Sequence, residues 1–180
     1  MIASERTQNI IVVSVIIIAV VSSGFLVSNA SYYGGSYSLA GRLDVTLVEV
    51  RVSRIDHTNE SVYPGLRLTF NLATDAVTEG NVRITFMGAE LTLNNDSLSY
   101  TAFSRVPQVA DQYLYPEFNR NYTLHNSATT SVDRQTILDA DTEDNWNWDI
   151  EFRYSFIVFD ERGTITWRWF YFETTITTII

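Results

Sequence analysis

Few of the side chains that carry out chemistry in proteins occur in this 180-residue sequence. Cysteine and lysine are both absent, and all twelve basic residues are arginine. The chain therefore cannot use a thiolate metal ligand, a cysteine nucleophile or a lysine Schiff base. The only imidazoles belong to His57 and His125, which lie in polar stretches typical of surface turns. No GxSxG or HExxH motif is present, so we predict a non-enzymatic protein without a cofactor.

A cluster of carboxylates is the best candidate for a metal site. Its members are Asp139, Asp141, Glu143 and Asp144. Carboxylate oxygens are the ligands that Ca²⁺ prefers, but the EF-hand spacing fails, because Asp144 stands where glycine is needed and Ile150 where the bidentate glutamate belongs. We interpret the cluster as the solvated end of a helix and keep it as a weak calcium candidate.

Two other groups of residues could mark contacts with glycans. Asn29, Asn59, Asn95 and Asn121 each begin an Asn-x-Ser/Thr acceptor for N-glycosylation, and three of them lie in turn-like polar stretches. The four tryptophans, at positions 146, 148, 167 and 169, could form a platform for sugar or lipid. All four fall on regular strand alternation, so we predict that they pack in the core.

A single apolar run determines where the chain resides. It begins at Ile10 and ends at Val27, and no charged residue occurs between Arg6 and Arg42. As a helix, such a run spans roughly 27 Å, which is close to the hydrocarbon thickness of a bilayer. We predict a retained membrane anchor. A cleaved signal peptide is the alternative, because small residues at positions 28–30 suit a signal peptidase.

The short flank before the run weakly favours a cytoplasmic amino terminus and an extracytoplasmic domain. We expect a cytoplasmic flank over residues 1–9, an anchor over 10–28, a flexible stalk rich in Ser, Tyr and Gly over 29–41, and one folded domain over 42–180. The formal charge of −9 argues against nucleic acid as a partner. Glycan acceptors without cysteines suggest an archaeal cell-surface glycoprotein.

Alternating apolar residues predict that the folded domain consists mainly of β-strands. Apolar residues alternate from Leu43, then slip by one position at Val48, which predicts a β-bulge in one long strand. Residues 66–73 and 82–87 also alternate, and Asn94-Asn95-Asp96 has the composition of a hairpin turn. The only helical candidate covers residues 132–140.

The strongest alternation lies near the carboxy terminus. Residues 146–158 hold one apolar face for seven alternations, and a second strand has Ile165, Trp167, Trp169 and Tyr171 on one face. We predict an antiparallel hairpin with an aromatic core face. The fold class that follows is an all-β, immunoglobulin-like antiparallel sandwich of about seven strands with one short helix, preceded by a single transmembrane helix.

The segment LRLTFNLATDAVTEGNVRITFMGAELTLNNDSLSY, residues 66–100, resembles the late-embryogenesis-abundant group 2 family, also called the water-stress and hypersensitive-response domain. A short helix before a long final hairpin is also similar to that family. The family's usual Asn-Pro is missing, because Leu72 follows Asn71. The resemblance implies an immunoglobulin-like sandwich, tethered by one membrane helix and without a known catalytic centre.

Two functions remain open. We favour a membrane-anchored surface module that meets protein, glycan or lipid outside the membrane. The alternative is a subunit of a surface filament, joined by strand addition through the uncharged segment that begins at Thr174 and ends at Ile180.

Overall fold

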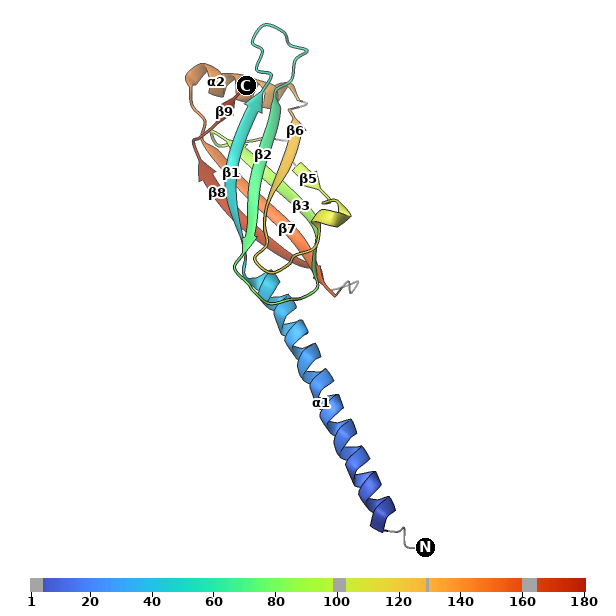
Figure 1. Cartoon of the computed structure of the whole chain (residues 1–180). Coiled ribbons are helices and arrows are strands. Elements are labelled where there is room, and N and C mark those ends of the chain that lie inside the picture. Colours follow the sequence, from blue (N-terminus) through green and yellow to red (C-terminus); the bar gives the residue numbers. More distant parts are fainter. Residues whose placement is uncertain (1–4, 99–102, 129, 160–164) are drawn as a thin grey trace.

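The computed structural model describes residues 5–98, 103–128, 130–159 and 165–180, which form two β-sheets and two α-helices. Figure 1 shows a long helix that enters one end of the paired sheets. The helices are α1 (Glu5–Gly41) and α2 (Ser131–Glu143), with a 3-10 turn at Val109–Asp111. The strands are β1 (Leu43–Ser53), β2 (Gly65–Thr74), β3 (Val82–Leu93), β4 (Asp96–Ser97), β5 (Phe103–Arg105), β6 (Asn119–Ser127), β7 (Trp148–Val158), β8 (Thr166–Thr174) and β9 (Thr178–Ile179).

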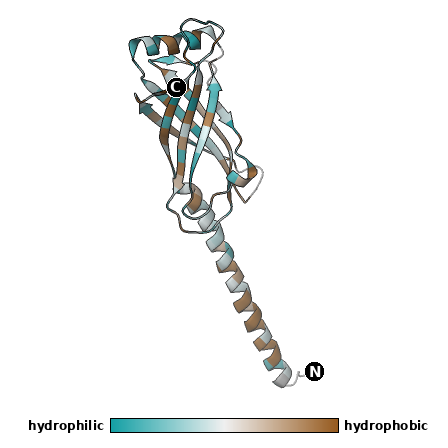
Figure 2. Cartoon of the chain, turned by 45° about the horizontal axis from the view of Figure 1, so that its top comes forward, coloured by the Kyte–Doolittle hydropathy of each residue, from teal (hydrophilic) through white to brown (hydrophobic). Residues whose placement is uncertain are grey.

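Helix α1 is long and apolar enough to cross a membrane. Its segment Thr7–Gly41 contains an 18-residue window of mean hydropathy 3.0, and none of that window is buried. Figure 2 shows that the apolar part lies in the half of the helix remote from the sheets. A fully exposed apolar helix surface is costly in water, and the composition of this half suits the interior of a bilayer.

Sheet A has the strand order β6-β2-β1-β9. Strands β1 and β2 pair antiparallel, and the register shifts between Leu47 and Glu49. The predicted bulge at Val48 is therefore confirmed. Beyond it, the buried positions of β1 change from odd to even numbers, which keeps Val50 and Val52 in the core.

Sheet B has the order β4-β3-β7-β8, and β5 also pairs with β3. The turn between β3 and β4 is confirmed at Asn94 and Asn95, which have φ angles of 52° and 71°. Asparagine tolerates this left-handed region, and two such residues in succession suit the twist of a two-residue hairpin. Strands β7 and β8 form the predicted antiparallel hairpin.

The inner faces of the two sheets share one core. Phe70 of sheet A and Phe152 of sheet B lie with ring centroids 4.2 Å apart, and both side chains are fully buried. The predicted helix is present as α2. Thr130 caps its first turn by accepting a hydrogen bond from the backbone N–H of Asp133. The two sheets therefore pack face to face as a sandwich.

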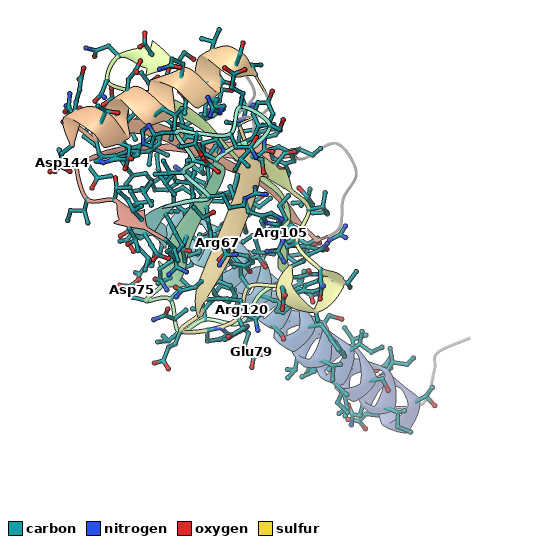
Figure 3. All side chains as sticks on the ribbon, turned by 90° about the horizontal axis from the view of Figure 1, so that it is seen from above. Arg67, Asp75, Glu79, Arg105, Arg120 and Asp144 are labelled. Atoms are coloured by element: carbon teal, nitrogen blue, oxygen red, sulfur yellow. The ribbon has the colours of Figure 1, made fainter. Side chains whose placement is uncertain are left out.

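The expected flexible stalk over residues 29–41 is wrong, because α1 continues without a break to Gly41. The reason is close packing on the β2–β3 loop. A Cβ atom on Gly35 would lie 2.0 Å from the carbonyl oxygen of Glu79, and one on Gly80 would lie 2.5 Å from the Cα of Ser36. Figure 3 shows Asp75 and Glu79, near the two ends of this loop, on the α1 side of the sheets.

Polar and aromatic contacts complete this joint. The backbone N–H of Asn81 donates to Ser36 Oγ at 2.9 Å, and the ring of Tyr33 packs at a tilt against Phe159 with centroids 4.1 Å apart. Helix α1 is therefore a rigid extension of the sandwich rather than a tether.

Two details of the predicted fold need correction. The described residues form nine strands rather than about seven, because the two-residue strands β4 and β9 are added. The sheets are also not wholly antiparallel. Strand β9 pairs with β1 in parallel, with Thr178 opposite Arg51.

Candidate binding face

The outer face of β8 carries three exposed aromatic side chains in a row. Trp167, Trp169 and Tyr171 expose 39%, 50% and 73% of their surface, and we call them the aromatic strip. The prediction that these residues face the core is wrong. Register explains the difference, because Trp167 pairs with Ser155, whereas Phe170 pairs with the buried Phe152.

The other two tryptophans do pack in the core. Trp146 and Trp148 are buried and stack with ring centroids 6.1 Å apart. Trp148 also donates from its indole Nε1–H to Thr177 Oγ1 at 2.9 Å. The prediction of core tryptophans is therefore confirmed for this pair and wrong for the pair on β8.

Ring contacts hold the strip in place. The rings of Trp167 and Trp169 have centroids 6.4 Å apart, and Phe86 of β3 meets Trp167 edge to face at 5.5 Å. These contacts order the rings while leaving much of each ring exposed. An ordered, exposed aromatic ring can contact a partner at a low cost in side-chain entropy.

Charged groups lie beside the strip on the same face. The register places Trp169 next to Arg153 and Tyr171 next to Glu151, which in turn faces Glu90 of β3. The last row is Thr92, Asp149 and Glu173. Arg153 Nη2 lies 3.2 Å from a carboxylate oxygen of Glu90. Four carboxylates and one arginine therefore accompany the strip, and we call this surface the acidic-aromatic face.

The outer face of sheet A is different, and we call it the polar face. Its rows across β1, β2 and β6 are Arg51-Arg67-His125, Glu49-Thr69-Thr123, Thr46-Asn71-Asn121 and Asp44-Ala73-Asn119. Asn71 donates to the side-chain oxygens of Asn119 and Asn121 at 2.7 and 2.8 Å. Figure 3 shows Arg67 and Arg105 beside β6. This face has no exposed aromatic ring in the described residues.

The four acidic candidates for calcium do not converge. Asp139 accepts a hydrogen bond from Gln135, Asp141 lies 2.8 Å from His57 Nε2, and Asp144 is the left-handed cap that ends α2. Glu143 is exposed on the last turn. Within the described ranges, no three His, Asp or Glu side chains are placed to hold a metal ion.

The loop that His57 belongs to is fixed to α2. Arg134 of α2 donates to the backbone carbonyls of Val62, Asp56 and Asn59. The hydroxyl and backbone N–H of Thr58 hydrogen-bond to the Asp56 carboxylate and lower its pKa. His57 therefore has a structural role at this end, whereas His125 lies on the polar face.

The structure separates the four glycan acceptors into three settings. Asn59 and Asn95 lie exposed in turns between strands. Asn121 lies in the middle of β6, where its side-chain oxygen accepts from Asn71. Asn29 lies on α1, two residues after the apolar run. Only Asn59 and Asn95 are in the turn setting that the sequence suggested.

The carboxy-terminal segment pairs with its own chain. The backbone N–H of Ile180 donates to the carbonyl of Val52 at 3.0 Å, and the backbone N–H of Arg54 donates to the carbonyl of Ile180 at 3.3 Å. The segment thereby crosses from sheet B to sheet A. It forms an edge of sheet A in its own chain, and its addition to the sheet of a neighbour stays a prediction.

Comparisons with known proteins do not place the chain in a family. No protein-family model and no curated protein matches it. Similar solved structures include a protein from Archaeoglobus fulgidus, with 8% identity and a TM-score of 0.45, covering 73% of this chain and 94% of that chain. Another is a Bordetella pertussis protein described as ApaA, with 12% identity and a TM-score of 0.41, covering 73% and 92% of the two chains.

Proposed function

We propose that this chain is a non-enzymatic, single-pass membrane protein whose sandwich stands outside the membrane and binds a partner through the acidic-aromatic face. The aromatic strip is the observation that carries the proposal. Trp167 and Trp169 occupy positions where a solvated sheet face normally has polar residues. Clustered, exposed aromatic rings are enriched at recognition surfaces.

The fixed joint between α1 and the sandwich supports this role. Because α1 is continuous and packed against the β2–β3 loop, the apolar half of the helix holds the sandwich in one orientation above the bilayer. Tyr32 and Tyr33 follow the apolar run by about one turn, which is where aromatic residues lie at a membrane interface. The acidic-aromatic face then stands along the membrane normal, accessible from the side (Figure 1).

The immunoglobulin-like connectivity and the relationship to the late-embryogenesis-abundant group 2 family remain part of this proposal. Two packed sheets, a short helix before the last hairpin and one amino-terminal helix support both. An archaeal source and N-glycans at Asn59 and Asn95 are further parts of the proposal, and such glycans would require an extracytoplasmic domain.

Photo-crosslinking in the native membrane tests the proposal. A photoreactive phenylalanine analogue replaces Trp169 in the full chain, and a matched variant carries it at Ser61, an exposed loop position away from the face. We expect adducts from position 169 and none from position 61. Protease added to the outside should remove the sandwich. Equal adduct yields at both positions, or a sandwich protected from external protease, would contradict the proposal.

A further inference from the structure

The outer faces of the two sheets carry complementary groups. We infer that the partner of the acidic-aromatic face is the polar face of a second copy, so that anchored copies associate side by side in rows. This inference rests on the proposed function and names its partner. Because the two faces lie on opposite sides of the sandwich, the contact is heterologous and can continue from copy to copy.

Two arginines of the polar face share one row. Arg51 lies directly opposite Arg67, and His125 follows on β6. Like charges opposite each other in a sheet are destabilising. Glu49 pairs with Arg51 at 2.7 Å, whereas Arg67 is exposed. An arrangement that costs stability in the monomer is explained if a negative surface covers this row.

The acidic-aromatic face supplies such a surface. Asp149 and Glu173 are paired across β7 and β8, and Glu151 faces Glu90 across β7 and β3. Among the described residues, Arg153 forms an ion pair with one of these four carboxylates, that of Glu90. The planar guanidinium of Arg67 could meet both carboxylates and aromatic rings, because arginine pairs with the former and stacks on the latter.

The two charged rows lie on the α2 side of a common level in the core. Phe70 and Phe152 touch across the core, so they mark a common level. Strands β2 and β7 both run toward the α1 end (Figure 1). Arg67 precedes Phe70 by three residues, and Asp149 precedes Phe152 by three, so both are displaced about 10 Å toward the α2 end.

The neutral parts of the two faces match in the same way. Tyr171 pairs with Glu151, one residue above Phe152, and Thr69 lies one residue above Phe70. Trp169 pairs with Arg153, which lies one residue below Phe152, and Asn71 lies one residue below Phe70. The aromatic strip therefore stands at the height of the threonine and asparagine rows. Parallel membrane helices would keep two copies in this register.

The membrane setting allows a weak contact to be effective. A face of three strands is smaller than the roughly 800 Å² per partner of a standard interface. Confinement of both copies to one bilayer raises their effective concentration, as tethering does for linked binding modules. Opposite charges on exposed faces are also screened by salt, so the association should weaken as ionic strength rises.

Engineered disulfides test the inference, since the natural chain has no cysteine. The full-length double variant Thr69→Cys and Tyr171→Cys is oxidised in its native membrane. We expect a ladder of dimers, trimers and longer species. Each single-cysteine variant should remain a monomer, because a heterologous contact never brings two copies of one position together. Crosslinking by the Tyr171→Cys chain alone would show a symmetric contact and overturn the inference.

Charge reversal gives an independent readout. In the double-cysteine chain, Arg67→Glu should reduce the ladder at least tenfold, and adding Asp149→Arg should restore it. The control Asp75→Arg reverses an exposed carboxylate away from both faces and should leave the ladder unchanged.

The outcomes separate this inference from the proposed function. If position 169 crosslinks only to a glycan or to another protein and no ladder forms, the second copy is the wrong partner, while the acidic-aromatic face remains a binding face. If position 169 gives no adduct and no ladder forms, both proposals fail.

Discussion

The two sheets carry the same kind of residues on their inner faces and different kinds on their outer faces. Inside, both present alternating apolar residues that meet at Phe70 and Phe152. Outside, sheet A is covered by amides, hydroxyls and two paired arginines, whereas sheet B exposes aromatic rings among carboxylates. Folding constrains the inner faces strongly and the outer faces weakly. Folding does not require the outer faces to differ, so their difference is better explained by function.

The largest expected effect separates the inside of sheet B from its outside. Phe152→Ala should cost about 3 to 5 kcal/mol of unfolding free energy, because it removes a fully buried ring at the centre of the core. Trp169→Ala, on the exposed face of the paired strand, should cost less than about 1.5 kcal/mol. Thermal melts of the full chain in detergent measure both. Similar losses for the two variants would contradict the division between core and binding face.

The second prediction concerns the joint that orients the two faces. Gly35→Ala should destabilise the sandwich by about 2 kcal/mol, because the new methyl group would collide with the Glu79 carbonyl. The matched control is Gly34→Ala, whose methyl group meets nothing within 4 Å. In a helix this change is neutral or stabilising by up to about 1 kcal/mol. Chemical denaturation of the two variants should therefore give effects of opposite sign. Equal effects would mean that α1 is not docked.

The third prediction compares one tyrosine from each sheet. Tyr122 of sheet A donates from its hydroxyl to the carbonyl of Asp111 at 2.5 Å. The hydroxyl of Tyr154 in sheet B is buried and has no hydrogen-bond partner in the described part of the chain. Tyr122→Phe should cost about 1 kcal/mol, whereas Tyr154→Phe should be neutral or stabilising, because it removes an unsatisfied polar group. Melting temperatures at neutral pH that fall for both variants would contradict this contrast.

The same tyrosines predict how stability depends on pH. Burial raises the pKa of Tyr122 and of Tyr154 to about 12, from an ordinary value of 10.0. The folded state therefore retains these protons while the unfolded state loses them. Their contribution is fully present below about pH 10 and is lost as the pH rises toward about 12. Denaturation midpoints above about pH 10 should fall less steeply in the Tyr154→Phe variant than in the parent.

Much of the fold could be predicted from the sequence, because local patterns determine it. The bulge at Val48 is visible as a one-residue slip, and the turn at Asn94 and Asn95 is visible in its composition. Helix α2 is visible as a short polar segment with two adjacent apolar residues. These features depend on residues that are close in sequence, so no tertiary information is needed.

The orientation of β8 could not be predicted, and it determines the candidate site. Both faces of β8 are aromatic, with Trp167, Trp169 and Tyr171 on one and Phe170 and Phe172 on the other. Hydrophobicity alone favours burying the longer run. The register with β7 decides otherwise, and it places Trp169 beside Arg153. The charged side of β7, which carries Asp149, Glu151 and Arg153, was the one sequence signal for this orientation of β8, because cross-strand neighbours share a face.

The continuation of α1 was missed for a related reason. Glycine and serine at positions 34–36 read as a flexible stalk when only composition is considered. In the structure, the small side chains permit close approach to the β2–β3 loop, and Ser36 is fully buried. Composition does not reveal whether a glycine provides freedom or contact. The distinction depends on residues 76–81, which are some forty positions away in the sequence.

The smallest expected effect on stability tests the paired arginines on sheet A. Arg67 lies opposite Arg51 and beside His125, so Arg67→Glu replaces a repulsion by an attraction. The variant should gain about 0.2 to 1 kcal/mol of unfolding free energy as a monomer in detergent at low salt. Thr69→Glu is a matched control that adds one negative charge to the same strand and face, beside Glu49. It should give no gain.

If the monomer gains stability while the membrane-bound chain loses its disulfide ladder, then Arg51 and Arg67 lower the stability of the monomer and promote association. If Arg67→Glu is no more stable than the parent, the repulsion between Arg51 and Arg67 is already relieved within the monomer, and the row by itself gives no reason to expect a covering partner.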